Sequence, residues 1–176
     1  MPLNIEIKAR CSNHEKVREV LCSLGADFKG VDHQIDTYFR VPGGRLKLRE
    51  GTIENALIYY EREDQAGPKK SDVILHSVKS DSSIKQLLTS ALGVLVTVDK
   101  RREIYFVGNV KVHLDTVDDL GTFVEIEAQD PDGTGRREDL LEQCRRFMDL
   151  FAVALDDLIP TSYSDLLLEK QQARGT

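Results

Sequence analysis

The sequence predicts an α+β fold in which a closed, eight-stranded antiparallel β-barrel carries helices packed on its outside. Three observations predict it. Eight segments alternate apolar and polar residues with period two, and most of them are separated by short turn sequences. Other segments have the apolar stripe of an amphipathic helix. Finally, eight strands can close around an interior that is just wide enough for side chains or one ligand.

The first half of the chain begins with a strand at Leu3–Arg10, where apolar and polar residues alternate strictly. A helix follows, because Ser12 and Glu15 have the spacing of a capping box and Gly25 is a typical helix end. The next strands are expected at Asp32–Arg40, Arg45–Glu50, Asn55–Arg62 and Asp72–Lys79. A mobile loop is expected at Gln65–Ser71, which contains Gly67-Pro68.

The second half opens with a helix over Ser82–Leu92, capped by Asp81 and ended by Gly93. A long amphipathic helix over Arg136–Ala152 and a short one over Ser162–Glu169 are expected near the end of the chain. The last three strands come between these helices, at Leu95–Phe106, Asn109–Thr116 and Gly121–Ala128. We expect one domain over residues 1–170 and a disordered tail over residues 171–176.

Composition limits the function classes. A chain of 176 residues suits one domain, and its net charge of −6 argues against nucleic acid as the main partner. We expect no membrane association, since no apolar run could span a bilayer and the first residues do not resemble a signal peptide. Cys11, Cys22 and Cys144 are far apart and form no zinc or redox motif. They are interpreted as reduced thiols, which predicts a cytoplasmic protein.

Charged residues occupy one face of nearly every predicted strand. For a single strand, a solvated face is the better interpretation. However, Arg45, Lys47 and Arg49 form a row of like charges, and helices with apolar stripes need a hydrophobic surface to cover. The apolar strand faces are therefore expected to point outward and the charged faces inward. The inward set includes Glu6, Lys8, Arg10, Asp36, Tyr38, Tyr60, Arg62, Lys100, Arg102, Lys111, His113, Asp115, Glu125 and Glu127.

An interior with this many charges needs compensation, because unpaired buried charge is very costly. Acidic residues compensate some of the cations, and the surplus cations suit a compact polyanion. Arg side chains bind phosphate oxygens in a fork-like manner, and Lys adds point charge. Clustered carboxylates can hold Mg²⁺ or Mn²⁺, which prefer oxygen ligands.

Several segments, taken in order, resemble the CYTH superfamily of triphosphate tunnel metalloenzymes, which includes class IV adenylate cyclases and thiamine triphosphatases. The resemblance spans nearly the whole chain; each segment alone is weak, but the ordered set is specific. The segments are Asn4-Ile5-Glu6-Ile7-Lys8-Ala9-Arg10, Gln34-Ile35-Asp36-Thr37-Tyr38-Phe39, Gly44-Arg45-Leu46-Lys47-Leu48-Arg49-Glu50, Tyr60-Glu61-Arg62, Lys100-Arg101-Arg102-Glu103-Ile104-Tyr105-Phe106, His113-Leu114-Asp115, Leu120-Gly121-Thr122-Phe123-Val124-Glu125-Ile126-Glu127 and Ser162-Tyr163.

This resemblance implies an eight-stranded tunnel, a divalent metal and a triphosphate substrate. It implies metal ligands at Glu6, Glu125 and Glu127, with Asp115 as a further ligand or a supporting group. It implies phosphate contacts from Lys8, Arg10, Arg45, Lys47, Arg49, Arg62, Lys100 and Arg102. Among these residues, the central catalytic roles would fall to Glu6, Lys8, Arg49 and Lys100. One departure is Asn4, which stands where the family carries the first Glu of its opening motif and brings no negative charge.

Three functions remain open on this basis. The first is metal-dependent hydrolysis of inorganic triphosphate, ATP or thiamine triphosphate, which demands least of the site. The second is a class IV adenylate cyclase, which would make cyclic AMP and pyrophosphate from ATP; a homodimer follows from that resemblance alone. The third is a non-catalytic polyphosphate or nucleotide binder, which Asn4 keeps in consideration. His113 is expected to have a structural role rather than to carry protons.

Overall fold

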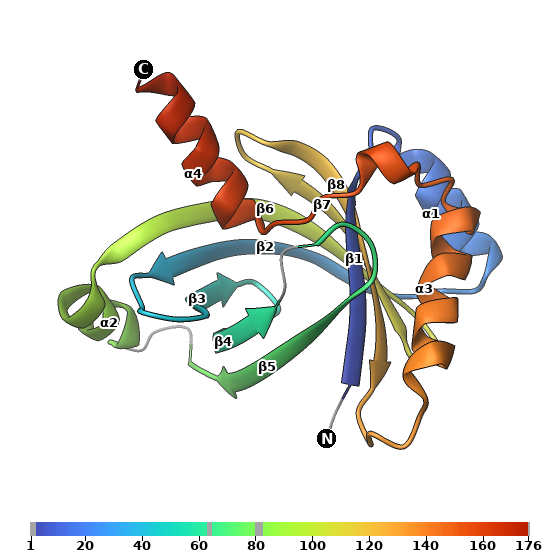
Figure 1. The fold of residues 1–176 in the computed structure, drawn as a ribbon, viewed down its shortest axis with the longest axis horizontal. Coiled ribbons are helices and arrows are strands. Elements are labelled where there is room, and N and C mark those ends of the chain that lie inside the picture. The colour runs from blue at the N-terminus through green and yellow to red at the C-terminus, as the bar shows by residue number, and fades with distance from the viewer. Residues whose placement is uncertain (1–2, 63–64, 80–82, 176) are drawn as a thin grey trace.

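The computed structural model describes residues 3–62, 65–79 and 83–175. Within these residues the chain forms one curled antiparallel sheet of eight strands, with four α-helices around it (Figure 1). In chain order the elements are β1 (Leu3–Arg10), α1 (His14–Ser23), β2 (Asp27–Phe39), β3 (Arg45–Gly51), β4 (Ala56–Arg62), β5 (Lys69–Ser77), α2 (Ile84–Leu92), β6 (Val94–Val107), β7 (Val110–Val117), β8 (Gly121–Asp130), α3 (Arg137–Leu150), a 3₁₀ turn (Leu155–Asp157) and α4 (Tyr163–Arg174).

The strands follow the order β1-β5-β4-β3-β2-β6-β7-β8, so that the two ends of the sheet meet at β1 and β5. β1 pairs with β8 along its whole length, from Leu3 opposite Asp130 to Arg10 opposite Phe123. It pairs with β5 at two positions only, Ile5 with Lys70 and Glu6 with Lys69. The predicted number and direction of the strands are confirmed. The prediction of a completely closed barrel is wrong. Strand twist separates the rest of β5 from β1, so the barrel is partly open between these two strands.

Several element boundaries differ from those predicted. β2 begins at Asp27, because its first residues pair with the end of β6 near Phe106. β5 begins at Lys69, inside the stretch predicted as a loop, because this part of the chain is paired with β1 and β4. α1 is capped by Asn13, which accepts a hydrogen bond from the Lys16 amide at 3.1 Å, rather than by Ser12. Asp81, the predicted cap of α2, lies outside the described residues.

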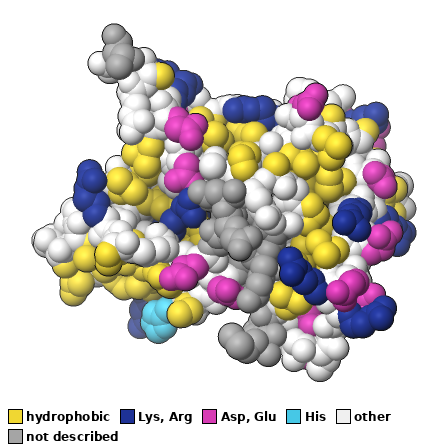
Figure 2. Space-filling view, viewed as in Figure 1, with side chains coloured by type: hydrophobic (Ala, Val, Ile, Leu, Met, Phe, Trp, Pro, Cys, Tyr) yellow, Lys and Arg dark blue, Asp and Glu magenta, His cyan; other side chains and the backbone are white. Residues whose placement is uncertain are grey.

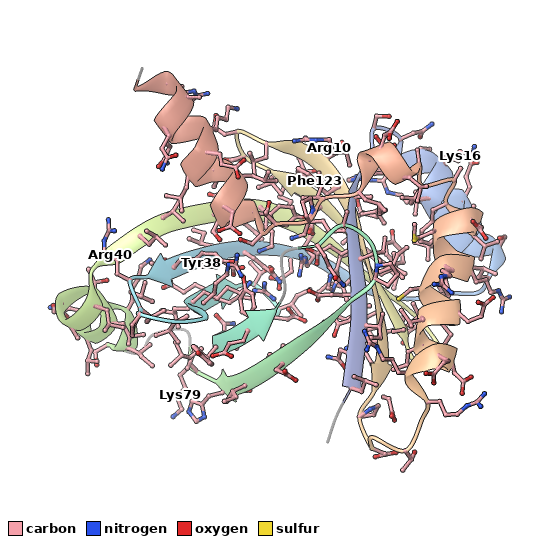
Figure 3. All side chains as sticks on the ribbon, in the orientation of Figure 1. Arg10, Lys16, Tyr38, Arg40, Lys79 and Phe123 are labelled. Carbon is pink, nitrogen blue, oxygen red and sulfur yellow. The ribbon has the colours of Figure 1, made fainter. Side chains whose placement is uncertain are left out.

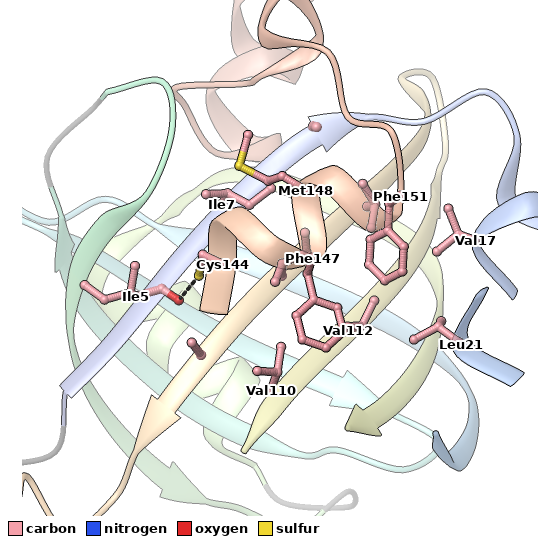
Figure 4. Packing of buried hydrophobic residues seen from close by; sticks show 14 of the residues in the cluster. Ile5, Ile7, Val17, Leu21, Val110, Val112, Cys144, Phe147, Met148 and Phe151 are labelled. Atoms are coloured by element: carbon pink, nitrogen blue, oxygen red, sulfur yellow. Dashed lines mark hydrogen bonds between the residues drawn. The ribbon is translucent and has the colours of Figure 1, made fainter. Parts of the chain in front are cut away.

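The outer side of β1, β7 and β8 forms the larger hydrophobic core, beneath α1 and α3 (Figure 4). Ile5 and Val112 contribute from the strands, and Leu21 and Phe147 from the helices. The Cys144 thiol of α3 donates a hydrogen bond to the Ile5 carbonyl at 3.2 Å (Figure 4). Here the apolar strand faces point outward to helices, as predicted, and the charged faces of the same strands point into the barrel.

α4 packs beside β6 and contributes Tyr163 and Leu167 to a second hydrophobic cluster. A capping box formed by Ser162 and Asp165 starts the helix. The predicted disordered tail is helical through Arg174, whose guanidinium lies 3.7 Å from Asp119 in the turn between β7 and β8. This contact gives the end of the helix a partner that the local sequence does not indicate.

Among the described residues, no helix is both long enough and apolar enough to cross a membrane.

Candidate functional site

The inward faces of all eight strands line a single cavity of about 800 Å³. Alternate residues of each strand supply the lining, as period two requires. β1, for example, contributes Asn4, Glu6 and Lys8, and β8 contributes Glu125 and Glu127. Ser162 and Tyr163, at the start of α4, also reach this cavity. The start of α4 is therefore part of the site.

Asp36 of β2 is the centre of a cationic group in the cavity. It accepts hydrogen bonds from Lys47 at 2.8 Å, from Lys100 at 2.8 Å, and from two nitrogens of Arg49, each at 2.9 Å. Burial alone would raise the pKa of this carboxyl, but Arg49, Lys100 and Lys47 hold it well below its usual range. Burial lowers the pKa of Lys100 to about 7. One carboxylate thus serves three cations, which leaves positive charge in excess on this side of the cavity.

Glu54, in the turn between β3 and β4, connects two sides of the barrel. It accepts hydrogen bonds from Arg49 at 3.0 Å and from Lys111 of β7 at 2.9 Å. Its position is fixed by the buried Asp32 carboxylate, which accepts hydrogen bonds from the Ile53 and Glu54 amides at 2.8 and 3.0 Å. Although burial opposes it, the cations Lys111 and Arg49 hold the pKa of Glu54 well below its usual range.

A second ion-paired group lies on β6, β7 and β8. Arg102 makes a two-pronged contact with Asp115, at 2.7 and 2.6 Å, and donates a further hydrogen bond to Glu125 at 2.9 Å. Glu125 also lies 3.1 Å from the Lys8 ammonium. The Tyr163 hydroxyl donates to Asp115 at 2.7 Å, and the Lys8 ammonium lies 3.9 Å from the centre of the Tyr163 ring. α4 therefore helps to position both Asp115 and Lys8.

His113 lies on the same side of the cavity. One ring nitrogen, Nδ1, is 3.2 Å from Glu125, while Nε2 is buried and has no hydrogen-bond partner within the described part of the chain. Burial, together with the nearby Arg102, lowers the pKa of His113 to about 4. The imidazole is therefore neutral at physiological pH.

An acidic group occupies β1 and β8. Glu6 and Glu127 are register partners across these strands. The Asn4 and Gln129 side-chain amides both donate to the same oxygen of Glu127, Oε1, at 2.9 and 3.0 Å. Burial raises the pKa of Glu127, and the carboxylates of Glu6 and Glu125 add to this rise. Crowded, partly buried carboxylates are the donor set that a hard divalent cation prefers.

The predicted metal ligands do not form one preformed cluster. In the described part of the chain, no three His, Cys, Asp or Glu side chains are arranged to hold a metal ion. Asp115 is fully buried against Arg102 and Tyr163, and Glu125 is held by cations. Glu6 and Glu127 are register partners on β1 and β8, and two adjacent carboxylates could hold a metal whose other ligands come from water or a bound phosphate.

The predicted phosphate contacts separate into two groups. Lys8, Lys47, Arg49, Lys100 and Arg102 all line the cavity. Arg10 and Arg45 are not among its described lining residues. Arg10 extends away from the cavity, donates to the Leu120 carbonyl at 3.3 Å and stacks on Phe123 (Figure 3). Arg45 lies at the edge and donates to Asp165 of α4 at 2.7 Å, and the side chain of Arg62 lies outside the described residues.

The functional prediction missed four residues that the structure brings into the site, namely Asp36, Glu54, Lys111 and Tyr163. Period two had placed Asp36 and Lys111 on inward faces but assigned them no role. Glu54 lies in a turn, where periodicity carries no information. Tyr163 lies in a segment that resembles the family. However, Lys8 and Tyr163 are near opposite ends of the chain, so no local pattern could predict their contact.

Comparisons with known proteins agree with this geometry. The family model described as the CYTH domain matches residues 2–163. A protein of Methanocaldococcus jannaschii, named as a candidate adenylate cyclase, is 25% identical over 173 residues, which cover 93% of this chain and 98% of that protein. A solved Pyrococcus horikoshii protein is 27% identical, with a TM-score of 0.79, over 93% of this chain and 98% of the other. A Hippeastrum protein, whose structure is described as revealing a dominant triphosphatase activity, shares the fold at 13% identity, with a TM-score of 0.62, over 98% of this chain and 96% of the other.

Proposed function

Because this chain belongs to the CYTH domain family, we propose that it is a metal-dependent enzyme that binds a triphosphate in the barrel and hydrolyses its terminal phosphoryl group. The observation that carries the proposal is the separation of charge inside the cavity. Two cations of β3 and one of β6 surround Asp36 of β2. By contrast, Glu6 of β1 and Glu127 of β8 are adjacent register partners. One side suits phosphate oxygens, and the other suits a divalent cation.

On the cationic side, Lys47, Arg49 and Lys100 would bind the triphosphate. Their present partner, Asp36, is one carboxylate shared among three cations, so phosphate oxygens can take over some of its hydrogen bonds. Arg49 offers the fork-like geometry that suits phosphate, and the two lysines add charge. Asp36 then keeps these side chains in place when no substrate is bound, because three unpaired buried cations would repel one another.

On the acidic side, Glu6 and Glu127 would hold Mg²⁺ or Mn²⁺. A bound divalent ion would neutralise charge on the phosphate oxygens as the phosphorus–oxygen bond breaks. Asn4 donates its amide to Glu127 and removes one negative charge from this side relative to the family's motif. This difference favours one metal ion over two.

Lys8 of β1 and Arg102 of β6 come from different strands of the cavity and share one partner, Glu125. Glu125 pairs with both of them, and Asp115 with Arg102, so their positions are fixed before substrate arrives. Phosphoryl transfer relies mainly on positioning and electrostatic stabilisation. These two cations are therefore assigned to the phosphate oxygens that gain charge as the terminal group leaves.

Adenylate cyclase activity is the second candidate. It is supported by the M. jannaschii relative, which is named for that activity and matches over nearly its whole length. In that reaction the ribose 3′-oxygen would attack the α-phosphorus in the same cavity. Non-catalytic binding is the third candidate. It is supported by Asn4, which stands where the family carries the first Glu of its opening motif.

Product analysis separates these candidates. The purified protein is incubated with tripolyphosphate, ATP or thiamine triphosphate, with Mg²⁺ or Mn²⁺, and the products are separated by ion-exchange chromatography. Orthophosphate with the corresponding diphosphate is the expected result. Cyclic AMP with pyrophosphate would replace the hydrolase proposal with the cyclase. Tight binding without turnover would favour the binder.

A further inference from the structure

His113 presents a buried polar atom to the cavity. Its ring lines the cavity, and the residue is 3% exposed. Nδ1 lies 3.2 Å from Glu125, whereas Nε2 has no hydrogen-bond partner within the described residues. Figure 2 shows charged side chains of both signs on the outer surface, where bulk water can satisfy their polar atoms. Nε2 is not on that surface, so its partner has to come from the cavity.

The surroundings of the ring determine which nitrogen carries the proton. Glu125 lies 3.1 Å from the Lys8 ammonium and accepts a hydrogen bond from Arg102 at 2.9 Å, so its carboxylate is ionised and can only accept. Nδ1 is therefore the protonated nitrogen. A second proton on Nε2 would add a positive charge beside Arg102 and leave a buried N–H without an acceptor. Nε2 is thus a neutral hydrogen-bond acceptor.

The register of β7, β8 and β1 places the ring beside the residues proposed to act on the triphosphate. His113 is opposite Glu125, which is in turn opposite Lys8. The next inward row across the same three strands consists of Lys111, Glu127 and Glu6. Successive inward residues of one strand are about 7 Å apart. His113 therefore lies in the row of Lys8 and one row away from the carboxylates proposed to hold the metal.

An acceptor at this place is selective for one kind of partner. Ionised phosphate oxygens carry no hydrogen, so they cannot donate to Nε2, whereas a water molecule can. From this geometry we infer that Nε2 of His113 accepts a hydrogen bond from the water that attacks the terminal phosphorus; this inference rests on the proposed hydrolysis. Because phosphoryl transfer depends mainly on positioning, an oriented water is what hydrolysis requires beyond triphosphate binding.

The reaction step takes no proton from the protein. The water oxygen bonds to the terminal phosphorus, the bond from this phosphorus to its bridging oxygen breaks, and the electron pair of that bond stays on the departing diphosphate. Both hydrogens of the water remain on the orthophosphate, which then equilibrates with solvent. His113 keeps its proton on Nδ1 throughout, so its contribution is the orientation of the water.

Two substitutions test the ring nitrogens separately. His113→Asn keeps a side-chain N–H near the position of Nδ1 and removes the group at Nε2. His113→Gln places an amide oxygen near the position of Nε2 and gives up the contact of Nδ1 with Glu125. The control is His76→Asn, because His76 is exposed on β5 and is not among the residues that line the cavity.

For each protein, steady-state release of orthophosphate from tripolyphosphate is measured over a range of Mg²⁺ concentrations. Calorimetry gives the Kd of tripolyphosphate without metal, and thermal unfolding checks the fold. We expect His113→Asn to lower kcat on the order of 100-fold, while KM and the metal-free Kd stay within about twofold of the wild-type values. His113→Gln should keep roughly tenfold more turnover than His113→Asn. His76→Asn should match the wild type.

A purely structural role predicts the reverse order, because the contact of Nδ1 with Glu125 would then matter most. Greater turnover in His113→Asn than in His113→Gln, or equal losses in both, would therefore overturn the inference. So would a raised Mg²⁺ requirement in His113→Asn with wild-type kcat at saturating metal, which would make the ring a metal ligand. If His113→Asn does not fold, His113→Gln decides: retained turnover supports the inference, and lost turnover overturns it.

Failure of the proposed function has a different signature. Absence of orthophosphate release from the wild type would reject hydrolysis, and the attacking water with it. Each of the results that overturn the role of His113 leaves wild-type hydrolysis intact.

Discussion

Asp36 accepts a hydrogen bond of 2.8 Å from Lys100, and the two residues are only 1% and 2% exposed. Lys47 and Arg49 share the same carboxylate, so its charge holds three cations together. We expect this arrangement to keep the proposed phosphate site assembled before a substrate binds. A triphosphate would then compete with Asp36 for the three cations.

Replacing Asp36 by Asn should lower the free energy of unfolding by about 3–5 kcal/mol, because it leaves buried cations without their partner. Saturating tripolyphosphate should raise the free energy of unfolding more in this variant than in the wild type, because the ligand supplies the missing negative charge. Urea unfolding with and without tripolyphosphate measures both effects. The control is Asp139→Asn, which removes an exposed ion pair with Arg136 and should leave stability nearly unchanged, because solvent screens such pairs. A ligand effect no larger in Asp36→Asn than in the wild type would contradict this account.

The lowered pKa of Lys100 predicts how stability depends on pH. Burial brings this pKa to about 7 in the folded protein, compared with 10.5 for an ordinary lysine. Between these values the unfolded chain binds more protons than the folded chain, so the contribution of Lys100 to the free energy of unfolding rises with pH, by roughly 1.4 kcal/mol per unit. In Lys100→Met this contribution is absent. Urea unfolding between pH 7 and 10 should therefore show a smaller rise with pH in the variant, and equal pH dependence in both proteins would reject the lowered pKa.

Gly51 gives the turn that carries Glu54 the room it needs. A Cβ atom at this position would lie 2.5 Å from the Glu54 carbonyl oxygen and 2.7 Å from the Asp32 carboxylate. Gly51→Ala should therefore displace the turn and lower the free energy of unfolding by about 1–3 kcal/mol. The matched control is Gly43→Ala, since a Cβ there would meet no atom within 4 Å. Thermal unfolding of both variants measures the difference, and equal stability would show that the turn does not depend on Gly51.

Sequence periodicity was sufficient to place most of the cavity lining. Glu6 and Lys8, like Glu125 and Glu127, alternate with apolar residues that α1 and α3 cover, and this local pattern fixes which face points inward. Arg10 shows where the pattern stops being informative. It shares the face of Lys8, but it is the last residue of β1 and lies beyond the cavity. Periodicity gives the face of a residue, not its position along the barrel.

Long-range pairing accounts for what could not be predicted. Gly67-Pro68 is a typical loop signal, yet β5 begins at the next residue because Lys69 and Lys70 pair with β1. The partners of Asp36 come from β3 and β6, and Glu54 contacts Lys111 of β7 across 57 positions of the chain. Such contacts depend on how the sheet curls, and no short segment encodes that. The short seam between β1 and β5 has the same origin.

We propose that Glu6 and Glu127 bind the metal ion on which turnover depends. The most direct measurement is orthophosphate release from tripolyphosphate and ATP by the wild type and by Glu127→Gln, with Mg²⁺ or Mn²⁺ titrated from zero. Glu138→Gln serves as control, because Glu138 is exposed on α3 and is not among the residues that line the cavity. Calorimetric titration of tripolyphosphate in the absence of metal checks that the cationic side of each variant is intact.

We expect wild-type turnover to require the metal and Glu127→Gln to lower turnover on the order of 100-fold. This variant should still bind tripolyphosphate without metal. Glu138→Gln should match the wild type. Metal-independent release of orthophosphate, or full activity of Glu127→Gln at every metal concentration, would contradict this proposal.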